Sequence, residues 1–283
     1  MARTEQLAVL FPGQGSQTAD MREAVERERP DLLELAQEMV GEDPFERVGQ
    51  GTRFDQPAIY SASLAGFERL GRPEAAFYAG HSLGEIAALA AAGALSEEDG
   101  LRVVAERGRL MQLASERADG GMVALRAGAS EAAEVADRAG ACVANDNAPD
   151  QVVLSAPEDV LGAVERVARE SGLRVKRLPV RGAFHSPLLE PVLPEFRAVL
   201  EAIDVGRPRI PVLSCVTAAP FDDVRARLAE ALVRPVRWLE VMRALHAAGV
   251  RRFVETGPGR VLSGLVRRSL GDVEALAPEA ARA

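Results

Sequence analysis

A serine between two glycines, in Gly80-His81-Ser82-Leu83-Gly84, is the part of the sequence best suited to covalent chemistry. The pentapeptide follows a short apolar run at 75–80 and precedes an alanine-rich segment, so it falls between a predicted strand and a predicted helix. Such a turn presents a serine hydroxyl at the edge of a sheet, beside the positive end of a helix. The pattern predicts a nucleophile, although the pentapeptide alone leaves a purely structural turn open.

A serine hydroxyl needs a base near neutral pH, and the sequence offers His81, His185 and His246. His81 adjoins the serine, and neighbouring side chains diverge at a sharp turn. His246 lies on a predicted helix without other reactive groups, and we interpret it as a structural or surface histidine. His185 lies in a loop between two predicted domains, where catalytic residues tend to occur. Because no carboxylate stands out as a third member and a backbone carbonyl can hold the imidazole, the sequence favours a Ser82–His185 dyad.

A glycine-rich turn, Pro12-Gly13-Gln14-Gly15, ends a second apolar run at 7–11. Acyl transfer at a serine creates an oxyanion, which well-placed N–H groups stabilise strongly. We expect the backbone N–H groups of Leu83 and Gln14 to form this oxyanion hole. A plain strand-to-helix turn is the alternative for the segment taken alone.

Arg107 is predicted to lie inside a helix at 97–117, among apolar residues and before Gly108. Most helical arginines are solvated, but a neighbouring glycine indicates a tightly packed helix. A buried guanidinium needs an anionic partner, and a carboxylate matches it in a bidentate manner. An acyl group with its own carboxylate, such as malonyl, would supply that partner.

The composition excludes several other functions. A net charge of −8 and only 4% aromatic residues argue against a nucleic-acid-binding surface. Cys142 and Cys215 lie far apart in apolar stretches, and the histidines lack metal-ligand spacing, so we expect no metal and no cofactor. No apolar run is long enough for a signal peptide or a membrane span. We therefore expect a cytoplasmic, monomeric enzyme without nucleic-acid or membrane partners.

The elements that must position these residues follow an α/β pattern. Strand-turn-helix units predict a mostly parallel sheet with helices on its faces. We expect strands at 7–11, 75–80, 210–216 and 251–255 and helices at 18–40, 83–92, 97–117, 190–202, 222–233, 238–248 and 260–270. The last dozen residues are predicted to fray or to lie loosely on the surface.

The middle of the chain has a different order of elements. We predict strands at 122–127, 141–146, 151–156 and 174–180, with helices at 130–139 and 157–170. The order β-α-β-β-α-β is typical of a ferredoxin-like unit. We expect it to be a small domain at 121–186, inserted into a large domain made of 1–120 and 187–283.

The chain resembles malonyl-CoA:acyl carrier protein transacylases and the acyltransferase domains of polyketide synthases. The resemblance covers nearly the whole chain, and its motifs occur in family order: FPGQGSQ (11–17), GHSLGE (80–85), RG-x-x-MQ (107–112), GAFHSPLLEP (182–191), PVRW (235–238) and ETGPGRVLSGL (255–265). It implies an α/β-hydrolase-like large domain with a ferredoxin-like small one. It also implies a ping-pong reaction that passes an acyl group from coenzyme A to an acyl carrier protein through acyl-Ser82.

The resemblance implies further site residues. His185 would be the base, Gln14 and Leu83 the oxyanion hole, and Arg107 the clamp on the malonyl carboxylate. The substrate-binding set would also include Gln56, His81, Asn147, Gln151 and Phe184. Phenylalanine before the catalytic histidine is associated with malonyl. Where the family often has a glutamine whose carbonyl orients the histidine, this chain has Ala231, and we expect the backbone to keep that role.

Alternatives stay open at this stage. The same dyad could serve an acyl hydrolase or a transferase for another acyl group, and a non-catalytic scaffold is a third possibility. An acidic carrier protein would need a local basic patch. Candidates for it are Arg174, Lys176, Arg177 and Arg181, or Arg267 and Arg268. The sequence does not distinguish fatty-acid from polyketide biosynthesis.

Overall fold

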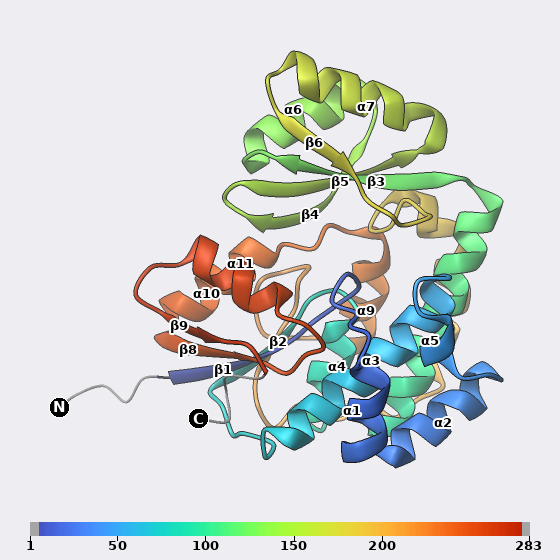
Figure 1. Cartoon of the computed structure of the whole chain (residues 1–283), viewed down its shortest axis with the longest axis vertical. Helices are drawn as coiled ribbons and strands as arrows, with labels where there is room; N and C mark the ends of the chain where they lie inside the picture. Colours follow the sequence, from blue (N-terminus) through green and yellow to red (C-terminus); the bar gives the residue numbers. More distant parts are fainter. Residues whose placement is uncertain (1–5, 279–283) are drawn as a thin grey trace.

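The larger of two sheets is parallel and five-stranded, with the order β7-β2-β1-β8-β9 (Figure 1). The computed structural model describes residues 6–278 of the chain. The central strand is β1 (Gln6–Phe11), between β2 (Phe77–Gly80) and β8 (Val250–Glu255). The edges are β7 (Val212–Leu213) and β9 (Glu274–Leu276). The predicted parallel sheet of an α/β fold is confirmed.

Alternation along β1 separates two helical layers. Val9 and Phe11 belong to one apolar core, whereas Ala8 and Leu10 belong to another, because successive side chains of a strand point to opposite faces. The first core includes residues of α1 (Met21–Glu28), α2 (Pro30–Val40), α3 (Thr52–Arg69), α4 (Gly84–Ala91), α5 (Glu97–Arg117), α8 (Leu193–Glu201) and α9 (Val224–Val233). The second includes α10 (Trp238–Ala247) and α11 (Val261–Ser269).

The smaller sheet is antiparallel and four-stranded, with the order β4-β5-β3-β6. Its elements are β3 (Gly120–Arg126), α6 (Ala129–Ala139), β4 (Cys142–Ala148), β5 (Gln151–Pro157), α7 (Glu158–Glu170) and β6 (Arg174–Arg177). The predicted order β-α-β-β-α-β is confirmed. Helices α6 and α7 cover the face turned away from the large sheet (Figure 1). On the other face Met122, Ala144 and Val153 join the first large core.

The small sheet is also fastened to the rest of the chain through its backbone. Asn145 of β4 bridges to Val236, whose N–H donates to the carbonyl of Ala144 and whose carbonyl accepts from Asp146. This contact lies just before α10, whose side chains belong to the second core. We keep the division into a small domain at 121–186 and a large domain at 1–120 and 187–283 as a proposal.

Helix α3 is an element that the sequence pattern did not indicate. Every residue from Asp55 to Phe67 is buried, so the helix has no polar face and its sequence has no apolar stripe at helical spacing. Its central position matters for function, because it packs against α5 and carries Gln56.

Four predicted elements differ from the structure. The helix predicted at 18–40 is two helices, because Pro30 lacks an N–H and disfavours the helical conformation for Arg29. The helix predicted at 190–202 begins as a 3-10 turn, η2 (Pro187–Val192), and becomes α8 only at Leu193. The strand predicted at 210–216 is reduced to β7, because the chain turns at Ser214.

The fourth difference concerns the end of the chain. Residues 274–276 do not lie loosely but form β9, which pairs in parallel with β8. Residues 279–283, which the same prediction covered, lie outside the described residues. A short 3-10 turn, η1 (Pro44–Arg47), completes the element order.

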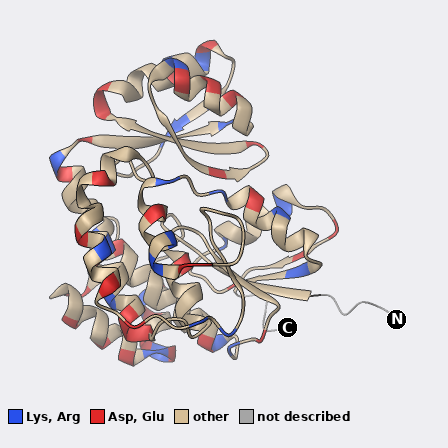
Figure 2. Cartoon of the chain, turned by 180° about the vertical axis from the view of Figure 1, so that it is seen from behind, with Lys and Arg blue, Asp and Glu red and all other residues tan. Residues whose placement is uncertain are grey.

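Charged residues lie on the helices and loops and on some strands, such as β6 and β8, while β1 and β2 carry none (Figure 2). Within residues 6–278, no helix combines the length and the apolar character needed to cross a membrane. No group of three or more His, Cys, Asp or Glu side chains suited to a metal ion occurs in that range either.

Candidate active site

The turn between β2 and α4 presents Ser82 in a strained backbone conformation. Ser82 has φ 54°, in the left-handed region that non-glycine residues rarely adopt. The flanking glycines explain how the turn is possible. A Cβ at Gly84 would lie 2.1 Å from the carbonyl oxygen of Phe11, and one at Gly80 would lie 1.9 Å from the carbonyl carbon of Gly84. The sharp turn therefore packs directly on β1, and Ser82 lies beside the N-terminus of α4.

The fold brings Ser82 and His185 together, although they lie far apart in the sequence. Ser82 Oγ lies 2.9 Å from His185 Nε2, and His185 Nδ1 lies 2.8 Å from the carbonyl oxygen of Ala231. Because a carbonyl can only accept, Nδ1 carries the proton and Nε2 is left to accept from the serine hydroxyl. The predicted contact between His185 and the Ala231 backbone is confirmed.

The surroundings of His185 keep it neutral. Burial lowers its pKa to about 3, with further lowering by the charges of Arg107 and His81. The loop that carries it is held by hydroxyl groups: Ser155 Oγ donates to the Phe184 carbonyl at 2.5 Å, and Ser186 Oγ donates to the Ala183 carbonyl at 2.6 Å. Like Ser82, His185 has a left-handed backbone, with φ 55°.

Arg107 lies inside the molecule and points at the serine. It is 3% exposed, and its Nη2 donates to Ser82 Oγ at 3.1 Å while its Nη1 donates to Gln56 Oε1 at 2.8 Å. The neighbouring Gly108 allows α5 to approach α3, since a Cβ there would lie 2.4 Å from the Thr52 carbonyl oxygen. Burial lowers the pKa of Arg107 to about 10, and the guanidinium stays charged at neutral pH.

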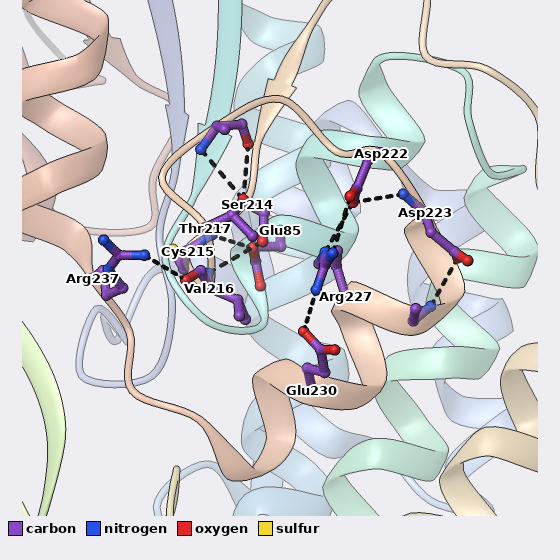
Figure 3. A network of polar contacts seen from close by, with 12 residues as sticks. Glu85, Ser214, Cys215, Val216, Thr217, Asp222, Asp223, Arg227, Glu230 and Arg237 are labelled. Carbon is purple, nitrogen blue, oxygen red and sulfur yellow. Dashed lines mark hydrogen bonds and ion pairs between the residues drawn. The ribbon is translucent and has the colours of Figure 1, made fainter.

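Glu85 is a buried carboxyl group near the site that sequence reasoning missed. It is 0% exposed, and its Oε1 accepts from the Cys215 N–H at 2.6 Å (Figure 3). Burial raises its pKa to about 8, and the charge of Arg107 opposes that rise. The sequence places Glu85 at the end of the GHSLGE motif, one turn after Ser82, but that position alone does not show that its side chain is buried.

Glu85 fastens the nucleophile helix to the segment that leads toward the base. The Cys215 thiol donates to the Gly80 carbonyl at 3.0 Å, and Arg237 donates to the Val216 carbonyl at 3.0 Å. Figure 3 shows the same segment continuing to α9, where Arg227 pairs with Asp222 and Glu230. The next residue of α9 after Glu230 is Ala231, whose carbonyl contacts His185.

The glycine-rich turn at 12–15 lies against the nucleophile turn. A Cβ at Gly13 would lie 2.4 Å from the His81 carbonyl oxygen, and the His81 N–H donates to the Phe11 carbonyl at 3.0 Å. The side chain of Gln14 reaches α3, where its Oε1 accepts from Gln56 Nε2 at 3.3 Å. The assignment of the backbone N–H groups of Gln14 and Leu83 to an oxyanion hole stays a prediction that this proximity favours.

His81 is engaged elsewhere than at Ser82. Its Nε2 lies 2.8 Å from Asn147 Oδ1, and its ring meets Trp238 edge to face at 5.5 Å. Asn147 is thereby joined to the nucleophile turn, as its predicted place near the site requires. His246 lies on α10, outside this group of contacts.

The remaining predicted binding residues divide into two cases. Phe184 is buried next to His185, with its ring against Gly182. Gln151 instead accepts from Arg268 at 2.8 Å, so its contact is with α11 and not with the hydrogen-bonded group around Ser82. An open hollow of about 540 Å³ lies nearby, lined by Arg126, Ala127, Gly128, Glu131, Pro149, Asp150, Gly172 and Arg174.

Both predicted basic patches are partly neutralised. Arg177 pairs with Glu158 and Glu165, and Arg268 pairs with Asp150. Among the described residues, no ion pair joins an acidic side chain to Arg174, Lys176, Arg181 or Arg267, so these four keep the prediction of a carrier-protein contact open.

Comparisons with known proteins show the family and the fold. The family model described as acyl transferase domain matches residues 36–282. The chain is 41% identical to the polyketide biosynthesis protein ThaF of Burkholderia thailandensis, over 97% of the chain but only 25% of that protein. It is 37% identical to the malonyl CoA-acyl carrier protein transacylase of Bacillus subtilis, over 93% of the chain and 90% of that protein. The solved transacylase of Coxiella burnetii superimposes with a TM-score of 0.91 at 32% identity, covering 98% and 95% of the two chains.

Proposed function

The chain belongs to the acyl transferase domain family, and from that premise we propose that it transfers a malonyl group from coenzyme A to the phosphopantetheine thiol of an acyl carrier protein. Relatives of this chain are named malonyl CoA-acyl carrier protein transacylases. The chain spans about a quarter of the ThaF protein and nearly the whole of the Bacillus transacylase. The substrates and the carrier partner are therefore part of the proposal, while acyl transfer is the activity of the family.

One observation carries the proposal: a base and a buried cation contact the same serine oxygen. Ser82 Oγ lies 2.9 Å from His185 Nε2 and 3.1 Å from Arg107 Nη2. A base is needed for any acyl-serine chemistry. A buried guanidinium beside the nucleophile selects an acyl group that carries its own negative charge.

In the first half-reaction, Ser82 Oγ attacks the thioester carbonyl carbon while His185 Nε2 takes the hydroxyl proton. The carbonyl oxygen becomes an oxyanion, which accepts hydrogen bonds from the N–H groups of Leu83 and Gln14. As the carbon–sulfur bond breaks, His185 returns the proton to the coenzyme A thiolate, leaving acyl-Ser82. The Ala231 carbonyl accepts a hydrogen bond from Nδ1. It keeps the ring in one orientation while Nε2 takes the proton and while it gives the proton back.

The second half-reaction reverses these steps with the carrier thiol. His185 takes the thiol proton, the sulfur attacks the acyl-Ser82 carbonyl carbon, and the proton returns to Ser82 Oγ as its bond to the acyl carbon breaks. Throughout both halves, Arg107 donates to the malonyl carboxylate. Water would compete as acceptor, so the balance between transfer and hydrolysis depends on access to the acyl-enzyme.

The proposal is tested by mixing the protein with malonyl-CoA and measuring its intact mass and peptide map. We expect a malonyl adduct on Ser82 that disappears when phosphopantetheinylated carrier protein is added, with malonyl-carrier as the product. A Ser82→Ala variant is the control and takes up no label. Free malonate in place of malonyl-carrier would assign the hydrolase alternative, and no adduct on the wild type would refute the mechanism.

A further inference from the structure

A row of hydrogen bonds leads from a buried carboxylate to the cation beside the nucleophile. Gln14 Nε2 donates to Asp55 Oδ2 at 3.4 Å, Gln56 Nε2 donates to Gln14 Oε1 at 3.3 Å, and Arg107 Nη1 donates to Gln56 Oε1 at 2.8 Å. Arg107 in turn donates to Ser82 Oγ. Asp55 and Gln56 are neighbours in the first turns of α3, so one helix carries both the carboxylate that Gln14 contacts and the glutamine that Arg107 contacts.

The two ends of the row fix its direction. A guanidinium can only donate, and an ionised carboxylate can only accept, whereas each glutamine has one donating and one accepting end. Arg107 therefore requires the oxygen of Gln56, which turns the NH₂ of Gln56 toward the oxygen of Gln14. The NH₂ of Gln14 then faces Asp55. With either glutamine reversed, two donors or two acceptors would face each other.

Asp55 is itself held in place by two further donors, one of which is a backbone N–H that cannot reverse. The backbone N–H of Gly49 donates to its Oδ1 at 2.7 Å, which leaves Oδ2 for Gln14. The side chain of Gln17 also donates to this carboxyl group, while Gln17 Oε1 accepts from the Gly15 N–H at 2.6 Å. Asp55 thus also ties down the turn that carries Gln14.

We propose that Asp55 is a positioning residue for acyl selectivity, because its acceptor-only carboxylate sets the direction of the Gln14 and Gln56 amides and keeps the oxygen of Gln56 on Arg107. The inference rests on the proposed role of Arg107 as the clamp for the malonyl carboxylate. It gives an acidic residue outside the reacting atoms a part in selecting a negatively charged substrate.

The isosteric change Asp55→Asn isolates this role. The Gly49 N–H keeps the asparagine oxygen at the Oδ1 position, so the new NH₂ faces the NH₂ of Gln14. This mismatch is relieved only when both Gln14 and Gln56 reverse their amides, and Arg107 then faces a donor. Asp55→Ala removes the acceptor without adding a donor, so Gln14 and Gln56 keep the direction that Arg107 imposes.

The stability of the variants follows a different order. Burial raises the pKa of Asp55, and hydrogen bonds from Gly49, Gln17 and Gln14 oppose that rise. The folded chain therefore carries a net cost for holding this charge at neutral pH. Asp55→Asn removes the charge and keeps the Gly49 hydrogen bond, which offsets the mismatch with Gln14, so it should unfold closer to the wild-type temperature than Asp55→Ala. Asp55→Ala loses that bond and leaves a cavity, so it should unfold at a lower temperature.

The experiment compares malonyl and acetyl loading of Ser82 from the coenzyme A thioesters in the wild type and both variants, together with thermal unfolding. We expect malonyl kcat/KM to fall about tenfold or more in Asp55→Asn, as for one charge-assisted hydrogen bond, and to fall less in Asp55→Ala. Acetyl loading should change little, so the malonyl-to-acetyl ratio drops most in the more stable variant.

The outcomes separate the inference from the proposed function. A wild type that takes up malonyl and acetyl equally, or neither, contradicts the role of Arg107 and with it this inference. A wild type selective for malonyl whose Asp55→Asn variant keeps the same ratio overturns the inference alone. Activity that follows thermal stability, with Asp55→Ala the poorer enzyme, would assign Asp55 a merely structural role. Should the alanine variant fail to fold, the ratio in Asp55→Asn decides.

Discussion

Replacing Arg107 with alanine tests the selection of the acyl group most directly. The guanidinium is 3% exposed and donates to Ser82 and Gln56, so the change removes a positive charge from the interior next to the nucleophile. Malonyl has a carboxylate for this charge to bind, and acetyl has none. We expect Arg107→Ala to impair malonyl loading while sparing acetyl loading.

The size of the effect follows from the hydrogen bonds lost. Each hydrogen bond to a charged group contributes about 1.5–3 kcal/mol, and a guanidinium can make two to one carboxylate. Loss of both corresponds to about 3 kcal/mol or more, which is a fall of roughly 10²-fold or more in kcat/KM for malonyl-CoA. Arg107→Lys keeps the charge without the planar fork of donors, so its kcat/KM for malonyl-CoA should lie between those of the wild type and Arg107→Ala.

The change also has a signature in the pH profile. The charge of Arg107 lowers the pKa of His185, second only to burial. Without that charge the pKa of His185 rises toward its ordinary value. A base acts only when unprotonated, and activity is lost as the pH falls through its pKa. The acidic limb of acetyl loading should therefore move to higher pH in Arg107→Ala.

Arg109→Ala is the matched control. Arg109 lies two residues further along the same helix, on the surface, where it pairs with Glu106 and Glu195. It should load malonyl and acetyl as the wild type does, with the same pH profile. The assay is the rate of acyl-enzyme formation by quenched intact mass spectrometry. Equal losses for malonyl and acetyl in Arg107→Ala, without a shift of the acidic limb, would refute the reasoning.

Three further predictions concern the turn, the base and the buried acid. Gly84→Ala should lower the free energy of unfolding, measured in urea, by about 1–3 kcal/mol or more, because its Cβ would lie 2.1 Å from a backbone oxygen. The control is Gly162→Ala, where a Cβ would meet no atom within 4 Å, and it should stabilise α7. Equal effects of the two changes would contradict the packing argument. His185→Gln should slow Ser82 acylation by roughly 10²–10⁴-fold. Loading of the wild type should persist well below pH 6.5, because burial lowers the pKa of His185 to about 3. A loss of wild-type activity centred near pH 6.5 would count against this. Glu85→Gln should become increasingly more stable than the wild type as the pH rises from 4.5 to about 8. A folded-state pKa of about 8 means that Glu85 loses its proton at lower pH in the unfolded chain than in the folded one. A constant difference in melting temperature between variant and wild type across that range would show that the acid is not buried as a neutral group.

The sequence was informative where a motif and its structural context agree. Ser82 could be predicted because the two glycines fall between an apolar run and a helix, and His185 because its loop joins two differently patterned regions. The Ala231 contact could be predicted because it needs only a backbone carbonyl, which any residue supplies. Arg107 could be predicted because Gly108 marks a close approach of helices.

The rest depends on packing that leaves no pattern in the sequence. Helix α3 is buried on all sides, so it lacks the periodicity by which amphipathic helices are found. Glu85 and Asp55 could not be assigned because a carboxylate in a helix is usually solvated. Only the structure places one against the Cys215 N–H and the other against Gly49 and Gln14.

Both members of the dyad have left-handed backbones, with φ 54° at Ser82 and 55° at His185. Such a conformation costs about 1–3 kcal/mol at each residue, so the surrounding packing must impose it. At Ser82 the close approach of Gly80 and Gly84 imposes this conformation. At His185 the hydroxyl groups of Ser155 and Ser186, which hold the loop, impose it.

These two constraints belong to different sheets. Ser82 is set by the turn packed on β1, whereas the carbonyl of Phe184, next to His185, is held by Ser155 of β5 in the small sheet. The 2.9 Å contact between Oγ and Nε2 therefore depends on how the small sheet is seated, through the Asn145–Val236 bridge and the His81–Asn147 hydrogen bond. The Ala231 carbonyl of α9 also holds the His185 imidazole. A displaced small sheet would therefore move the loop of His185 while this hydrogen bond keeps the ring in place.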